Sequence, residues 1–141
     1  MAEYDRDNVF AKILRGELPA HRLYEDDATL AFMDIMPRGR GHCLVIPKSP
    51  ARNILDIEAE SLTAVAATVQ RLAQAVKKAY DADGVTVQQF NEAAGGQVVF
   101  HLHFHVIPRF EGVPLAAPGT SMEMAEVLEA NAERIRAALI S

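Results

Sequence analysis

Three histidines alternate with apolar residues in the second half of the chain. His101, His103 and His105 are separated by Leu102 and Phe104. Because strand side chains point alternately to two faces, this pattern predicts three imidazoles on one face, about 6.7 Å apart from one to the next. An imidazole has an ordinary pKa of ~6.5, so near neutral pH it can be a nucleophile or a protonated acid. Such a row is suited to attack on phosphorus, in which one imidazole adds to a phosphate and a neighbour protonates or orients the leaving group.

Candidate donors for phosphate oxygens lie just upstream of these histidines. Asn91 offers a side-chain amide, and the loop Gly95-Gly96-Gln97 offers backbone N–H groups. The two glycines permit close approach of the backbone to a ligand. We therefore expect the phosphate donors and the nucleophile to lie on neighbouring segments of the fold.

Two other interpretations of the histidines stay open at the level of the residues. Two or three histidines at this spacing could bind zinc, with His42 or Glu92 as a further ligand. They could also be the outward-facing polar side chains of a half-exposed strand. Three identical titratable side chains in one row favour the catalytic interpretation.

Apolar runs and amphipathic segments predict the elements that position the histidines. Their spacing indicates a short helix at 8–14, a long helix between 56 and 83 and a last helix at about 121–139. Strands are expected at 21–25, 28–35, 42–47, 84–91 and 97–108. Because the strands follow one another on short connections, we predict an α+β fold, an antiparallel sheet of about five strands with helices packed on it. A chain of 141 residues matches one domain, so we expect a single domain over 1–141.

Composition and charge exclude several classes of protein. A net charge of −5, no Trp and three Tyr argue against binding to nucleic acid. No run of eighteen apolar residues is present, so no membrane partner is expected. The single Cys43 cannot form an intrachain disulfide, which favours a cytoplasmic location. The basic residues are expected on a solvated face, among them Arg38, Arg40, Lys48 and Arg52.

The histidine segment and two further blocks resemble a known family. HLHFHVI, at 101–107, resembles the His-φ-His-φ-His-φ-φ signature of the histidine triad (HIT) superfamily, in which φ is apolar. The stretch 8–48 is similar to the amino-terminal half of the Hint branch, and NEAAGGQ is similar to its phosphate loop. The resemblance implies a HIT-like fold, a homodimer, and a hydrolase that cleaves purine nucleoside phosphoramidates through a nucleotidyl-histidine. The implied partner is a purine nucleotide with an AMP or GMP moiety, and no cofactor or metal is implied.

The same resemblance assigns roles to individual residues. His103 would be the nucleophile, with its second nitrogen donating to backbone. His105 would contact the scissile phosphate and serve the leaving group, while His101 and His42 would support the two rings. Asp34 would accept both ribose hydroxyls. Phosphate oxygens would be held by Asn91, Gly96, Gln97 and Val98, and the purine would be enclosed by Val9, Phe10, Ile13, Phe32, Ile35 and Leu44.

The chain also departs from the family pattern. The Hint branch usually has a serine where this chain has Val98, so one hydroxyl contact is missing and slower turnover is expected. Some bacterial relatives bind zinc through a Cys-x-x-Cys at the positions of Asn8 and Ala11, and this chain has neither cysteine. Three alternatives therefore remain: a dinucleoside polyphosphate hydrolase, a nucleotide-binding regulatory protein with little turnover, and a metal-binding β protein.

Overall fold

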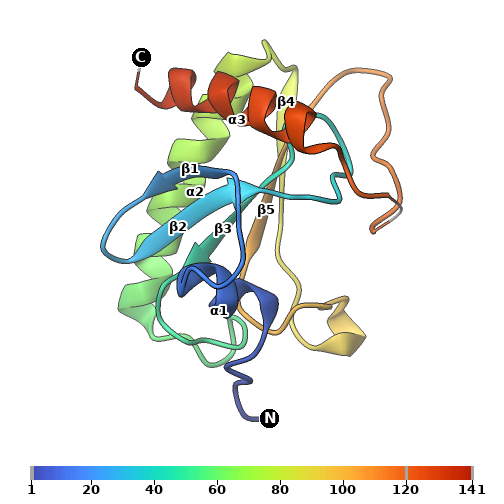
Figure 1. Cartoon of the computed structure of the whole chain (residues 1–141). Helices are drawn as coiled ribbons and strands as arrows, with labels where there is room; N and C mark the ends of the chain where they lie inside the picture. Colours follow the sequence, from blue (N-terminus) through green and yellow to red (C-terminus); the bar gives the residue numbers. More distant parts are fainter. Residues whose placement is uncertain (1, 120, 141) are drawn as a thin grey trace.

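Five strands form one antiparallel sheet in the computed structural model, which describes residues 2–119 and 121–140 (Figure 1). The strand order is β1-β2-β3-β5-β4. The strands are β1 (Arg22–Glu25), β2 (Thr29–Met33), β3 (Cys43–Pro47), β4 (Gly84–Gln88) and β5 (Phe104–Arg109). The helices are α1 (Val9–Leu14), α2 (Ala59–Ala79), α3 (Ala125–Leu139) and the short 3-10 helix η1 (Ala93–Gly95). The predicted α+β fold with a five-stranded antiparallel sheet is confirmed.

Helices cover the two faces of the sheet unequally. The long helix α2 packs along one face with α3 beside it, and the short helix α1 lies on the other face (Figure 1). Every residue of β2 and β3 is buried, because both faces of these two strands are covered. The α2 face buries residues such as Ala31 and Val45, and the opposite face buries Phe32 and Leu44 against α1.

One row of side chains crosses four strands on the α1 face. Phe32 pairs with Leu44, Leu44 with His105, and His105 with Gln88. Residues directly opposite on neighbouring strands have their side chains on the same face. The row therefore runs from an apolar side chain on β2 to a polar one on the edge strand β4, with a histidine between them.

The last strand is shorter than the sequence predicts. It begins at Phe104 rather than at residue 97, so His101 and His103 precede it and the three imidazoles are not an even row on one strand. The cause is competition for backbone hydrogen bonds. The N–H of Leu102 donates to the carbonyl of Ala51 at 2.9 Å, in the loop after β3, instead of to a neighbouring strand.

Other predicted boundaries also shift. The strand expected at 84–91 ends at residue 88, and the one expected at 28–35 covers 29–33. The last helix begins at Ala125 instead of about 121. The N–H of Glu123 donates instead to the carbonyl of Ile35 at 2.8 Å, which holds the approach to α3 against the loop after β2.

Within the described ranges, none of the helices combines the length and the apolar character that crossing a lipid bilayer requires.

Candidate active site

Three of the predicted histidines meet on the α1 face of the sheet. The ring centroids of His103 and His105 are 5.1 Å apart, and those of His105 and His42 are also 5.1 Å apart. His42 lies directly before β3, and His105 lies in β5, the neighbour of β3 in the sheet. The packing of two adjacent strands thus builds a cluster that is distributed over 63 positions of sequence.

The hydrogen bond of His103 determines which of its nitrogens is free. Its Nδ1 lies 2.7 Å from the carbonyl oxygen of His101. A carbonyl can only accept, so Nδ1 carries the proton and Nε2 keeps its lone pair. Burial lowers the pKa of His103, which keeps the ring neutral at physiological pH. A neutral imidazole with a free Nε2 has the state that a nucleophile needs.

His42 and His105 form a hydrogen-bonded pair whose direction is set by the backbone. The N–H of Arg38 donates to Nδ1 of His42 at 2.9 Å, so the His42 proton is on Nε2. That Nε2–H donates to Nδ1 of His105 at 2.9 Å, which leaves His105 with its proton on Nε2. Burial, aided by nearby positive charge, lowers the pKa of His42 to about 3 and that of His105 to about 4. His105 therefore offers a neutral N–H donor beside the free nitrogen of His103.

His101 has both ring nitrogens engaged inside the protein. Its Nε2 donates to the carbonyl of Pro47 at 2.9 Å, so its Nδ1 accepts from the hydroxyl of Tyr4 at 2.6 Å. The side chain is fully buried, and burial lowers its pKa to about 4. His101 therefore has no nitrogen left for a ligand, and its carbonyl orients His103.

Asp34 stands behind the histidine pair. Its Oδ2 lies 3.3 Å from Nε2 of His42 and 3.9 Å from Nδ1 of His105, and its Oδ1 accepts from the N–H of Met36 at 2.8 Å. Burial raises the pKa of Asp34 to about 6. The Asp34 side chain is 17% exposed, so part of it stays accessible to a ligand.

Asp34, His42 and His105 also form a group that could hold a metal ion. One ligand atom from each lies within 4.8 Å of the others. A histidine that binds a metal through Nε2 must carry its proton on Nδ1. In His42 that nitrogen accepts from Arg38, so binding a metal would break this hydrogen bond. The donor set therefore fits a hydrogen-bonded pair better than a metal site.

Apolar side chains predicted to enclose a base gather beside His103. Phe10, Ile13, Phe32 and Leu44 belong to one buried cluster. The ring of Phe10 lies edge-on to that of His103, with centroids 4.9 Å apart. Val9 and Ile35, the other two predicted members, are 46% and 47% exposed and do not belong to this buried cluster.

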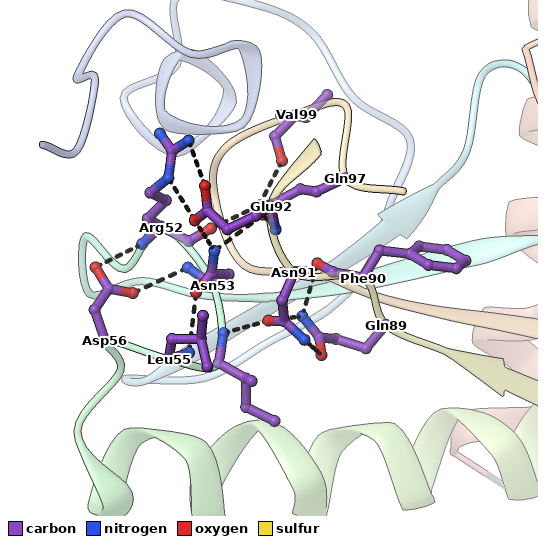
Figure 2. Close-up of polar contacts among 11 residues, drawn as sticks. Arg52, Asn53, Leu55, Asp56, Gln89, Phe90, Asn91, Glu92, Gln97 and Val99 are labelled. Carbon is purple, nitrogen blue, oxygen red and sulfur yellow. Dashed lines mark hydrogen bonds and ion pairs between the residues drawn. The ribbon is translucent and has the colours of Figure 1, made fainter. Parts of the chain in front are cut away.

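The loop after β4 is held from behind by its own side chains (Figure 2). Oδ1 of Asn91 accepts from the N–H of Ile54 and from Nε2 of Gln89, both at 2.9 Å. Gln97 is buried; its Oε1 accepts from the N–H of Glu92 at 2.7 Å and its Nε2 donates to the carbonyl of Arg52 at 2.7 Å. The side chain of Gln97 thus shapes the loop. The backbone N–H groups of the loop, expected from the sequence to be open to a ligand, are also engaged: Gly96 donates to the carbonyl of Ala93 and Gln97 to that of Glu92, both at 3.0 Å.

Gly96 and Val98 are the two other predicted residues of this loop. Gly96 has φ +98°, and a Cβ there would meet the ring of Phe90 at 3.3 Å. A larger residue at this turn is therefore strained by the backbone conformation and crowded by the ring of Phe90. Val98 is 83% exposed, so its side chain adds an apolar surface and no hydrogen bond where a serine would offer a hydroxyl.

Two surface hollows, of about 480 and 260 Å³, lie around residues 109–115. Neither is lined by an imidazole, so neither offers a nucleophile comparable with His103.

Residues 15–112 match the family model of the HIT domain. The chain belongs to the HIT family. Adenylylsulfatase HINT3 of Arabidopsis thaliana is 41% identical over 105 residues, which cover 74% of this chain and 53% of that protein. This HIT chain is thus a member of a nucleotide-binding family.

Solved structures of HIT proteins have the same fold. A Hit-like protein of Bartonella henselae, involved in cell-cycle regulation and crystallised with an unknown ligand, superposes with a TM-score of 0.94 at 55% identity. The match covers 97% of this chain and 99% of that one. A Zn-bound histidine triad protein of Mycobacterium smegmatis superposes with a TM-score of 0.83 at 37% identity, covering 95% and 94% of the two chains.

Sequence reasoning missed several residues that hold this HIT site together. Arg52 and Arg38 were expected on a solvated face, and Glu92 was considered as a zinc ligand. Instead Arg52 forms two hydrogen bonds with the Glu92 carboxylate, at 2.8 and 3.0 Å, and Asn53 adds a third at 2.6 Å (Figure 2). Tyr4 was not singled out. These partners are 39 to 97 positions apart, so no local pattern in the sequence could reveal them.

Proposed function

We propose that this HIT protein hydrolyses purine nucleoside 5′-phosphoramidates at the α-phosphorus, through a nucleotidyl-histidine at His103. The observation that supports this most directly is the position of the protons on His103 and His105. Nδ1–H of His103 donates to the His101 carbonyl, which leaves Nε2 free, and His105 presents an N–H on the neighbouring ring. A nucleophile and a hydrogen-bond donor therefore stand side by side.

The reaction proceeds in two displacements. The nitrogen of the leaving group takes a proton from solvent. Nε2 of His103 attacks phosphorus, and the phosphorus–nitrogen bond breaks with its electron pair going to the amine. The N–H of His105 donates a hydrogen bond to the departing group. Water then attacks phosphorus, loses a proton to solvent and returns the bonding pair to Nε2 of His103. The products are an amine and a nucleoside monophosphate.

The remaining residues bind and orient the nucleotide in this proposal. Asp34 accepts the ribose hydroxyls, and the purine lies against the cluster that contains Phe10 and Leu44. Phosphate oxygens are held by Asn91, Gly96 and the backbone around Gln97 and Val98, with the N–H groups of Gly96 and Gln97 exchanging their bonds to the carbonyls of Ala93 and Glu92 for the phosphate. Supporting this, the loop that carries them is hydrogen-bonded from behind and lies beside the strand that follows His103.

The experiment is intact-mass analysis after brief mixing with an adenosine phosphoramidate, quenched without acid. Wild type is expected to gain the mass of an adenylyl group, and His103→Ala is expected to gain none. His21→Ala is the matched control, because His21 bonds Glu129 and lies outside the cluster, and it should form the adduct normally. No adduct on wild type, together with no product in a single-turnover assay, would indicate a nucleotide-binding protein without this chemistry.

A dinucleoside polyphosphate hydrolase is the alternative enzyme, and it would use the same residues. The two activities differ in the leaving group alone. The ratio of kcat/KM for an adenosine phosphoramidate to that for diadenosine polyphosphate distinguishes them, and we expect it to exceed one.

We also propose that the protein is a cytoplasmic homodimer that pairs along β4. This strand is an edge of the sheet, and Val87 in it is 46% exposed. An unpaired edge is a template for pairing with a second chain. Light scattering should give twice the mass of the chain, and Val87→Lys should lower it to the monomer mass. A monomeric wild type would contradict the proposal.

A further inference from the structure

Arg38 lies in the loop between β2 and β3 and connects three segments. Its backbone N–H donates to Nδ1 of His42 at 2.9 Å. Its side chain donates through Nη1 to Oε1 of Gln88 at 3.2 Å and through Nε to the carbonyl of Ala116 at 2.8 Å. The carbonyl of Arg38 accepts in turn from the N–H of Ala116 at 2.8 Å. The guanidinium is therefore held in one place from two directions.

This place is next to His105. Gln88 stands directly opposite His105 in the pairing of β4 and β5, so both side chains lie on the α1 face. Neighbouring strands are about 4.8 Å apart, so a group that bonds Gln88 is close to the His105 ring. The positive charge of Arg38 contributes, after burial, to the lowered pKa of both His42 and His105.

The order of groups across the sheet puts Arg38 on the side of the leaving group. The apolar cluster for the base lies on β2 and β3, the reacting histidines come next, and Gln88 follows on β4. In a displacement at phosphorus the leaving group departs roughly in line with the attacking atom. In the proposed function His105 serves the leaving group, and Gln88, opposite His105 on β4, and the Arg38 guanidinium that bonds it are polar groups beside that ring.

The charge of Arg38 is not neutralised by the protein. Both acceptors of its side chain, Gln88 and Ala116, are neutral. Throughout 2–119 and 121–140, no carboxylate forms an ion pair with it, whereas Arg52 is paired with Glu92. Asp34 is the acid that faces the cluster, and it lies at the Nδ1 edge of His105, away from the Nε2 that meets the substrate.

We propose that Arg38 selects substrates whose leaving group carries a negative charge close to the bond that breaks. The shared chemistry is an anion within reach of a fixed guanidinium. It can be the carboxylate of an amino acid linked through its amine, or an inorganic oxyanion such as sulfate. The inference rests on the proposed function and adds the class of leaving group to it.

The test compares two adenosine phosphoramidates that differ in one charge. One has β-alanine as the leaving amine and the other has β-alaninamide, so both contain the same kind of phosphorus–nitrogen bond. We expect Arg38→Gln to lower the ratio of kcat/KM, acid over amide, about tenfold relative to wild type, because a charge-assisted hydrogen bond is lost. Any intrinsic difference between the substrates cancels in this comparison of ratios. Arg38→Lys should keep part of the preference.

Arg40→Gln is the matched control. It changes the net charge by the same amount as Arg38→Gln, but at a residue two positions further along the chain. The guanidinium carbon of Arg40 lies 5.0 Å from the centroid of the Tyr80 ring. Its ratio should equal that of wild type, and thermal unfolding should show all variants folded. Adenylyl sulfate, assayed in parallel, tells whether an inorganic anion gains from Arg38 as a carboxylate does.

The outcomes separate the two proposals. A ratio that Arg38→Gln leaves unchanged, or that Arg40→Gln lowers equally, overturns the role of Arg38 while the proposed function stands. If wild type cleaves neither phosphoramidate and forms no adduct, the proposed function fails and the role of Arg38 fails with it.

Discussion

At the scale of the residue, Asp34 combines a cost in stability with a role in binding. Burial raises its pKa to about 6 from the ordinary 3.8, so its charge is unfavourable in the folded protein. The folded state holds this proton more tightly, so the stabilising contribution is complete below pH 3.8 and is lost as pH rises through 6. The quantity to compare is the unfolding free energy of wild type minus that of Asp34→Asn. We predict that this difference falls by at most about 3 kcal/mol as pH rises from 4 to 8. Urea unfolding at both pH values measures this difference.

Asp26 is the control of opposite sign. Burial acts to raise its pKa, but hydrogen bonds from Ala28 and Thr29 outweigh burial and the pKa is lowered. The unfolding free energy of wild type minus that of Asp26→Asn should therefore rise with pH.

Asp34→Asn should also raise KM for an adenosine phosphoramidate about tenfold at pH 8, because charged hydrogen bonds to the ribose are lost. An unchanged KM would remove Asp34 from the binding site.

At the scale of the element, the loop after β4 depends on the loop after β3. The carboxylate of Glu92 accepts from Arg52 and from the fully buried Asn53, and Glu92 itself has φ +62° (Figure 2). We predict that Glu92→Gly, which relieves the backbone strain but removes the carboxylate, lowers kcat/KM about tenfold or more, because the phosphate donors are no longer held. Glu92→Gln, which keeps an acceptor for Asn53, should lower it less. Steady-state kinetics on both variants measures the effect.

Glu25 offers a matched control for this prediction. It pairs with Arg22 and Lys48 through the same kind of ion pair, but at the far edge of the sheet. Glu25→Gln should leave kcat/KM unchanged. If Glu92→Gly keeps full activity, the two loops position the phosphate donors independently of Glu92.

At the scale of the whole molecule, the buried histidines make the fold sensitive to acid. Burial lowers the pKa of His42 to about 3 and those of His101 and His105 to about 4, while an unfolded imidazole titrates near ~6.5. Their contribution to stability is complete above pH 6.5 and is lost as pH falls toward the folded values. We predict a loss of at most about 2 kcal/mol for each of them at pH 5. The three losses together exceed the gain from Asp34 over the same range, so urea midpoints should drop between pH 7 and 5. A midpoint that stays constant over this range would contradict the prediction.

The sequence by itself determined the parts of this protein that follow from local periodicity. The helical spacing within 56–83 and the short apolar runs predict the α+β sheet, and the histidines mark the position of the site along the chain, although the even row that their alternation predicts does not form. Such patterns can be recognised in a sequence because side-chain direction repeats every two residues in a strand and every 3.6 residues in a helix. The family resemblance of 101–107 was likewise a local signal, and the HIT domain match confirms it.

Only the tertiary structure decided which proton His105 carries and what holds the loops. The proton of His105 depends on its hydrogen bond with His42, which is 63 positions away. Glu92 meets Arg52 across 40 positions, and Tyr4 meets His101 across 97. The late start of β5 has the same origin, because the segment before it bonds a distant loop. Hydrogen bonds between remote segments leave no periodic trace, since their partners are chosen by folding and not by spacing along the chain.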